Sequence, residues 1–295
     1  MELPAGPVVM GVINVTPDSF SDGGLYLDVD AAVEHGRELA AEGAAILDIG
    51  GESTRPGAAE VPEAKELERV VPVIERLAQA SGPRAAVISI DTRKAAVAER
   101  ALQAGARIVN DVSAFRHAPE IAGMVASAGA HCCLMHMLGE PRTMQQDPRY
   151  DDVVSDVKAF LEERLAFAVG EGIPEDHVWL DPGIGFGKTV DHNLELLRRL
   201  DEIVAIGRPV VIGTSRKSFL GKITGRDEQG RLPGTIATNV IAWERGARVF
   251  RVHDVAPVAD ALEVAAATVP PAEAAGAVGK TAARKRTRER PTMRN

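Results

Sequence analysis

Six residues in the last third of the sequence have side chains suited to binding an anion: Ser215, Arg216, Lys217, Ser218, Arg251 and His253. The first four belong to the segment GTSRKSF, where hydroxyl and cationic groups at the start of a helix can cradle a phosphate. Arg251 and His253, in RVHD, are two residues apart, so a strand directs both side chains to one face. We therefore predict an anion-binding site built from these two segments.

Three acceptor residues form a second candidate group: Asp91, Asn110 and Asp181, each of which closes an apolar run. Carboxylates removed from water are costly unless donors meet them. One interpretation pairs Lys217 with one of these carboxylates. The other interpretation is a ligand with a donor-rich, guanidine-like edge, because a carboxylate accepts two parallel N–H bonds from such an edge.

Two glycine-rich segments are more typical of loops at strand ends than of nucleotide sites. DPGIGFGKTV has Pro182 where a P-loop needs glycine, and its last glycine comes one residue too early for a dinucleotide fingerprint. What is left is a loop that begins at Asp181 and exposes Phe186. The second segment, DIGGESTRPGA, offers Thr54 and Arg55 as donors well before the next predicted helix. We predict that both loops face the active site.

The histidines and cysteines of HCCLMH do not have the spacing of a metal site or a nucleophile. His131 and His136 are five residues apart, hence on opposite faces of a strand, so they do not chelate one ion together with Glu140. Cys132 and Cys133 are adjacent, and a disulfide between them would be strained. We expect reduced thiols, as in a cytoplasmic protein. No Ser-His-Asp or Cys-His set is recognisable.

Short apolar runs alternate with longer stretches of helical apolar spacing, many of which end in glycine. The runs predict strands over residues 8–14, 44–50, 85–91, 107–111, 131–136, 177–181, 208–213 and 248–253. The longer stretches predict helices over residues 30–42, 63–80, 94–104, 119–128, 152–172, 191–200 and 234–246. This alternation predicts an α/β fold with a parallel sheet.

The polar residues at the strand ends decide between an open, doubly wound sheet and a closed barrel. Almost every predicted strand ends in one or two of them: Asn14, Asp48, Asp91, Asn110, Asp111, His136, Asp181, Thr214 and His253. Any one of them can be a turn former or a helix cap. Residues from all parts of the chain converge only if the strand ends form a ring. We predict a single (β/α)8 TIM barrel with the active site at the C-terminal ends of its strands.

Charge is unevenly distributed along the 295 residues. The formal net charge is −8, but residues 270–295 carry +5, which leaves −13 for residues 1–269. A body that acidic does not bind nucleic acid through its general surface. We predict a catalytic domain over residues 1–268 and a disordered basic tail over residues 269–295, for which a role as a nucleic-acid or partner-binding arm stays open.

The sequence also indicates where the protein works. Its first residues, MELPAG, have neither the basic nor the apolar part of a signal peptide, so we expect none. No run approaches the roughly 18 apolar residues of a membrane span. We expect a cytoplasmic protein without a membrane partner.

Taken together, the segments resemble dihydropteroate synthase, the folate-pathway enzyme family that sulfonamides inhibit. MGVINVTPDSFSDGG and GGESTRPGA resemble the two signature segments of the family, and IDT, NDVS, LMHM, DPGIGFGK, SRKSF and RVHDV follow in the family's order. The resemblance runs from Val8 to about Ala267 and leaves only the tail uncovered. It implies the condensation of 6-hydroxymethyl-7,8-dihydropterin pyrophosphate with p-aminobenzoate to 7,8-dihydropteroate and pyrophosphate. It also implies Mg²⁺ as cofactor and a homodimer.

The resemblance assigns roles to individual residues. The pterin would be held by Asp91, Asn110, Met135, Asp181 and Lys217. The pyrophosphate would be held by Asn14, which also contacts Mg²⁺, and by Thr54, Arg251 and His253. The p-aminobenzoate site would be framed by Ser53, Pro56, Phe186 and Ser218, together with the residues given a catalytic role: Phe20, Asp22, Arg55 and Lys217.

The implied chemistry agrees with what the sequence lacks. Pyrophosphate is a good leaving group, the electron-rich dihydropterin stabilises the methylene cation, and an arylamine attacks without a strong base, as in an SN1-like reaction. In NVTPDSFSDGG, Pro17 and the Gly23–Gly24 pair bracket a segment that can open and close. Phe20 would then cover the arylamine, and Asp22 would shield the cation on closure.

Two alternatives stay open. A pterin-binding methyltransferase barrel shares the fold and the acidic group, but it has no need of SRKS, RVH or the residues of the opening loop, and no corrinoid-binding region follows here. A pterin-binding scaffold without turnover would be expected to lack loop residues that this sequence retains, among them Asn14, Asp22 and Lys217. Fold-level resemblance alone does not separate such functions.

Overall fold

The computed structural model describes residues 3–16, 24–53, 60–80, 82, 85–140 and 143–268, with the side chains of the first helix from residue 29 on. The strands are β1 (Val8–Asn14), β2 (Ile46–Gly50), β3 (Val87–Asp91), β4 (Ile108–Asp111), β5 (His131–Met135), β6 (Val178–Asp181), β7 (Val211–Ile212) and β8 (Val249–Val252). The helices are α1 (Gly24–Ala41), α2 (Glu63–Ala78), α3 (Ala95–Ala104), α4 (Ile121–Ala128), α5 (Val153–Gly170), α6 (Val190–Arg198), α7 (Leu200–Val204), α8 (Ser218–Thr224), α9 (Leu232–Glu244) and α10 (Val255–Thr268), with short 3-10 turns at Glu175–His177 and Gln229–Arg231.

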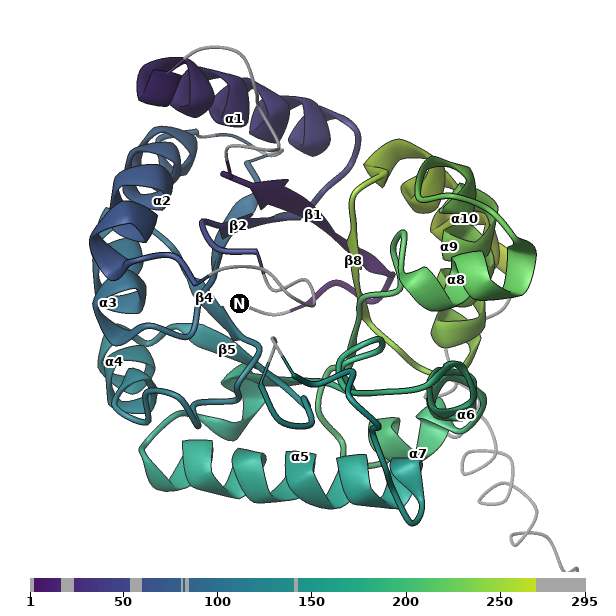
Figure 1. Ribbon diagram of the computed structural model, residues 1–295. Helices are drawn as coiled ribbons and strands as arrows, with labels where there is room; N and C mark the ends of the chain where they lie inside the picture. Colours follow the sequence, from purple (N-terminus) through teal and green to yellow (C-terminus); the bar gives the residue numbers. More distant parts are fainter. Residues whose placement is uncertain are drawn as a thin grey trace, which may run out of the picture.

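The strands form one parallel sheet in the order β6-β5-β4-β3-β2-β1-β8-β7. A bridge between Leu180 and Val210 joins the two outer strands, where the Leu180 N–H donates to the Pro209 carbonyl at 2.9 Å. The sheet therefore closes into a barrel, and the helices surround it on the outside (Figure 1). The predicted (β/α)8 barrel is confirmed.

Two apolar layers hold the barrel together. The larger lies between the strands and the surrounding helices, with members such as Ile90, Leu134 and Phe250. The smaller fills the barrel and consists of Val8, Met10, Ile46, Ile108, Cys133, Trp179, Val211 and Val249. Because side chains alternate along a strand, the residue two positions further on points to the same interior. From Trp179 this is Asp181, and from Val249 it is Arg251, so a polar layer lies directly above the apolar one.

The elements differ from the predicted ones in a few places. The predicted helix over 191–200 is interrupted at Arg199, whose φ of −112° and ψ of 30° are not helical, so that α6 and α7 are separate. A helix start was predicted at GTSRKSF, where α8 begins, but without bounds, and no range was predicted for α10. The tail, residues 269–295, lies outside the described residues, so its disorder and the domain boundary at 268 stay predictions. Among the described helices, none is both long and apolar enough to cross a membrane.

Candidate active site

A cavity of about 470 Å³, counted with its opening to solvent, lies at the carboxyl ends of the strands. Eight of the predicted site residues line it: Asp91, Asn110, Met135, Asp181, Phe186, Lys217, Arg251 and His253. The rest of the lining is Val112, Gly183, Ile184, Gly213 and Ser215. The acceptor group and the anion group, predicted separately, therefore share one cavity.

Other predicted residues lie elsewhere. Asn14 is half-buried at the end of β1, paired in register with Gly50. Ser53 is half-buried just beyond β2, and Ser218 is exposed at the start of α8. None of these three lines the cavity. Five predicted residues lie outside the described residues: Phe20, Asp22, Thr54, Arg55 and Pro56.

Arg251 connects three strands across the mouth of the barrel. From β8, its Nε donates to Asp48 Oδ2 at 2.6 Å and its Nη2 donates to Asp91 Oδ2 at 2.7 Å. Asp48, on β2, is fully buried and also accepts from Ser89 Oγ at 2.6 Å and from Asn110 Nδ2 at 3.0 Å. It thus fixes the side chains of both Arg251 and Asn110. The sequence pattern places Asp48 among the strand-end polar residues but gives it no role in the site.

Of the carboxylates with which Lys217 could pair, Asp181 lies within range of its charge. The ion pair with Asp91 is made by Arg251, while Lys217 Nζ lies 4.0 Å from the centroid of the Phe186 ring. This places a cation against the face of the aromatic ring, an attractive arrangement. Lys217 is close enough to Asp181 for its charge to lower the pKa of that carboxyl, although burial outweighs this and raises the pKa overall.

Burial sets the protonation of the site. It raises the pKa of Asp91 to about 7, against the opposing charge of Arg251 and with a further upward contribution from Asp48. Burial and the neighbouring Arg251 charge lower the pKa of His253 to about 3, so this imidazole is neutral at physiological pH. Its ring then carries one N–H and one free nitrogen. Near neutral pH the cavity is therefore lined by a titrating carboxyl and a neutral histidine.

The loop after β6 is held by close backbone contacts. Gly183 has φ +68°, and a Cβ there would lie 1.9 Å from the carbonyl oxygen of His136, so only glycine fits. Lys188, buried at the end of the loop, donates to His136 Nδ1 at 2.9 Å and to the Phe186 carbonyl at 3.0 Å. Burial lowers the pKa of Lys188 to about 7. We did not predict Lys188, although a lysine inside a glycine-rich loop was the available signal.

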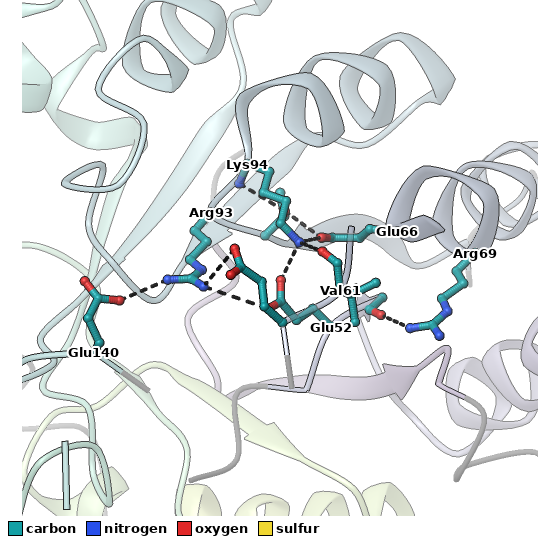
Figure 2. A network of polar contacts seen from close by, with 10 residues as sticks. Glu52, Val61, Glu66, Arg69, Arg93, Lys94 and Glu140 are labelled. Carbon is teal, nitrogen blue, oxygen red and sulfur yellow. Dashed lines mark hydrogen bonds and ion pairs between the residues drawn. The ribbon is translucent and has the colours of Figure 1, made fainter. Parts of the chain in front are cut away.

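A buried charge network lies at the base of the loop after β2 (Figure 2). Lys94 Nζ donates to Glu52 Oε2 and Glu66 Oε2 at 2.5 Å and to the Val61 carbonyl at 2.7 Å. Glu66 also accepts from the Thr92 hydroxyl at 2.7 Å. Lys94, from the loop after β3, thus binds the chain on both sides of residues 54–59.

Arg93 extends this network toward a third loop. Its guanidinium donates to Glu140 after β5 at 3.0 Å (Figure 2). It also lies 3.8 Å from Glu52 and 3.9 Å from Glu60. Three loops at the carboxyl end of the barrel are therefore tied to one another through adjacent basic residues.

Comparison with known proteins identifies the chain. The model of the pterin binding enzyme family matches residues 10–253. This chain belongs to the pterin-binding enzyme family. It is 45% identical over 264 residues to the dihydropteroate synthase of Escherichia coli K12, covering 89% of this chain and 92% of that one.

Two solved structures of this family from Xanthomonas albilineans are also similar. A dihydropteroate synthase with 4-aminobenzoic acid is 48% identical, has a TM-score of 0.83, and is matched over 89% of this chain and 93% of its own. One in complex with 7,8-dihydropteroate is 46% identical, with a TM-score of 0.80 and coverage of 89% and 94%. The pterin-binding enzyme described here is accordingly a transferase of the dihydropteroate synthase type.

The arrangement in this family member suits binding more than acid–base attack. The cavity is lined both by the acceptors Asp91, Asn110 and Asp181 and by the cations Lys217 and Arg251. Within the described residues, no three His, Cys, Asp or Glu side chains gather closely enough to hold a metal ion. Asn14, at the end of β1, carries an amide oxygen. That fits Mg²⁺, which takes one or two protein oxygens and completes its shell with phosphate and water.

Proposed function

We propose that this protein joins 6-hydroxymethyl-7,8-dihydropterin pyrophosphate to p-aminobenzoate and releases 7,8-dihydropteroate and pyrophosphate. The observation that supports this most directly is the presence of buried acceptors and of cations in the lining of one cavity. A molecule that carries a donor-rich heterocycle and a polyanion needs both.

The acceptor side suits the pterin. Asp181 would accept N–H bonds from the aminopyrimidinone edge, and Asp91 and Asn110 would bind the donors of the other ring. Met135 belongs to a small apolar cluster with Val112 and would cover the ring face. The N–H donors of a bound pterin would form hydrogen bonds to the Asp91 carboxylate in place of those to water that burial removes. Pterin binding would therefore favour the ionised form of Asp91.

The cationic side suits the pyrophosphate. Arg251 and the neutral His253 would donate to its oxygens, and Asn14 would contact both the pyrophosphate and Mg²⁺. Bound there, Mg²⁺ would neutralise charge on the leaving group. Thr54 would assist from the loop after β2.

The reaction then needs little from the protein beyond positioning. The C–O bond to the pyrophosphate breaks, its electron pair leaves with the pyrophosphate, and the dihydropterin ring stabilises the methylene cation. The lone pair of the arylamine forms the C–N bond, and one amine proton passes to solvent. Lys217 would hold the pterin, and Asp22 would shield the cation.

The p-aminobenzoate site would lie beside Phe186, whose ring already packs against the ammonium of Lys217. Ser53, Arg55, Pro56 and Ser218 would frame it, and Phe20 would cover the arylamine. A flat aromatic acid is suited to such a place because ring stacking and a cation act on different parts of it.

We also propose that the protein is a cytoplasmic homodimer. The family resemblance supports the dimer, and Cys132 and Cys133, both buried and without a disulfide, suit a reducing compartment. Light scattering on the eluting protein measures the oligomeric state, and a monomer at micromolar concentration would contradict the proposal.

Pyrophosphate release tests the function. We expect purified protein with both substrates and Mg²⁺ to release pyrophosphate and form dihydropteroate in equal amounts, with release dependent on p-aminobenzoate. Asp181→Asn should weaken pterin binding and turnover together. Absence of pyrophosphate release from the parent protein would refute the proposal, and pterin binding without release would favour a scaffold.

A further inference from the structure

The loop between β7 and α8 has an uncommon backbone conformation at Arg216. Its φ is +56°, in the left-handed region, and among the described residues it shares a positive φ with only three other non-glycine residues. For an L-residue with a long side chain this conformation costs roughly 1–2 kcal/mol. Such a conformation persists only where the surroundings hold it.

Three elements hold Arg216 in this conformation. Its N–H donates to the hydroxyl of Thr235, which is buried on α9, at 3.1 Å. Its carbonyl accepts from Arg231 Nη1 at 2.9 Å. Its guanidinium donates through Nε and Nη2 to both carboxylate oxygens of Asp254, at 2.9 and 2.5 Å. We predicted Arg216 as an anion donor, but its guanidinium is engaged with Asp254 and it does not line the cavity.

The turn at Arg216 determines where the side chains of the adjacent residues are directed. Ser215 and Lys217, on either side of Arg216, both line the cavity, whereas Arg216 is directed to Asp254. Asp254 in turn follows His253, which also lines the cavity. A second contact joins the same two loops, since Ser215 Oγ accepts the His253 N–H at 3.1 Å and lies 3.0 Å from His253 Nδ1. The loops after β7 and β8 are therefore fastened to each other at two successive residues.

We propose that Arg216 and Asp254 are a positioning pair that holds Lys217 and His253 at a fixed separation for the pyrophosphate-bearing substrate. This inference rests on the proposed function. Neither residue touches the substrate. Without the pair, Lys217 keeps its charge and the neutral His253 keeps its N–H donor, but the two side chains lose the fixed distance between them.

The variant Arg216→Gly distinguishes the effect of the side-chain pair from the effect of the backbone turn. Because glycine adopts φ +56° without strain, Arg216→Gly removes the guanidinium and leaves the turn permitted. Asp254→Asn removes the charge from the other side and leaves Arg216 in place. For both variants we expect the KM for the pterin pyrophosphate and the dissociation constant of inorganic pyrophosphate, measured by calorimetry, to rise about 10-fold. The change in kcat should stay within about threefold.

Arg199→Ala is the matched control. Arg199 makes the same kind of contact, to Asp152 and Glu202 at 2.7 Å each, but between α5, α6 and α7 and outside the cavity lining. We expect it to lower the thermal unfolding midpoint as much as Arg216→Gly does, with KM and pyrophosphate binding unchanged. A KM increase equal to that of Arg216→Gly would mean that general destabilisation is responsible, and would overturn the inference.

A charge exchange completes the test. Aspartate tolerates the left-handed region, so Arg216→Asp combined with Asp254→Arg can rebuild the pair in reverse. We expect the double variant to bind pyrophosphate within about threefold of the parent, while each single exchange loses more than the 10-fold of the neutral variants. Pyrophosphate affinity within twofold of the parent in both Arg216→Gly and Asp254→Asn overturns the inference. A parent that binds pyrophosphate but releases none from the substrates overturns the proposed function instead, and the binding comparison among variants still decides the role of the pair.

Discussion

Replacing Lys94 by methionine would remove the charge at the centre of the network in Figure 2. Lys94 is 8% exposed, and Glu66, which it contacts, is 1% exposed. Burial lowers the pKa of Lys94, but its hydrogen bonds to Glu52 and Glu66 outweigh this and raise the pKa overall, so the ammonium is charged at neutral pH. Methionine keeps the length and the apolar stem of the side chain and provides no donor.

The expected loss of unfolding free energy depends on the carboxylates that are left without their partner. Removing one partner of a buried ion pair costs about 3–5 kcal/mol, because the other charge is left unpaired. Two features favour the lower end of this range. Glu66 would retain the hydroxyl bond from Thr92 at 2.7 Å, and Glu52, at 13% side-chain exposure, has access to water. We therefore expect Lys94→Met to lower the free energy of unfolding by about 3 kcal/mol.

Urea unfolding followed by circular dichroism at pH 7 measures this loss. Adding Glu66→Gln to Lys94→Met should recover about half of it, because the stranded charge is removed. The control is Lys65→Met, whose partner Glu68 is 58% exposed while Lys65 itself is 37% exposed. An exposed pair of that kind contributes less than about 0.5 kcal/mol. Equal losses in Lys94→Met and Lys65→Met would refute the assigned role of the buried network.

Three further predictions concern the site. The pKa of Asp91 is raised to about 7, so the folded state binds a proton more tightly than the unfolded state, and the free energy of unfolding falls as the pH rises from about 4 to 7. The urea midpoint of Asp91→Asn should therefore rise relative to that of the parent over this pH range. A difference between the two midpoints that does not change with pH would contradict this. The pKa of Lys188 is lowered to about 7, so between pH 7 and 10.5 the unfolded state binds more protons than the folded state and the free energy of unfolding rises with pH. Urea midpoints at pH 7 and 9.5 should show this gain in the parent and not in Lys188→Met. Gly183→Ala should lower the free energy of unfolding by more than about 3 kcal/mol, because the added Cβ would lie 1.9 Å from the His136 carbonyl oxygen. The control Gly129→Ala, with φ +60° and nothing within 4 Å of its Cβ, should lower it by about 1 kcal/mol. Similar losses for both variants in urea titrations would show that the structure relieves the contact at position 183 at little cost.

The strands and the outline of the site were predictable from local pattern. Apolar runs of Val, Ile and Leu predicted every strand, because buried parallel strands need apolar side chains on both faces. Polar residues at the ends of those runs, such as Asp91 and Asp181, predicted the acceptor group. The spacing of Arg251 and His253 placed both on one face, and both line the cavity.

The partners within the site were not predictable in the same way. The sequence left open which carboxylate Lys217 would approach and did not predict that Arg251 binds Asp91, because the choice between two cations depends on where their side chains lie in three dimensions. Arg216 has the composition of an anion donor, and only its left-handed backbone shows that it is directed to Asp254. Sequence spacing indicates which residues share a strand face, but it does not indicate which of several donors reaches a given acceptor.

The contact between Arg251 and Asp91 is itself an argument for closure of the barrel. β8 and β3 are separated in the sheet by β1 and β2, which in a flat sheet would put them about 14 Å apart, at roughly 4.8 Å per strand interval. An extended arginine reaches about 7 Å from its Cα and an aspartate about 3 Å, so the two side chains together would fall short of that span. The observed distance of 2.7 Å requires the sheet to curve until the two strands face each other across its interior. Closure of the barrel brings Lys217, which follows β7, and Arg251 on β8 into one cavity with the acceptors of β3, β4 and β6, so the site depends on the closed barrel.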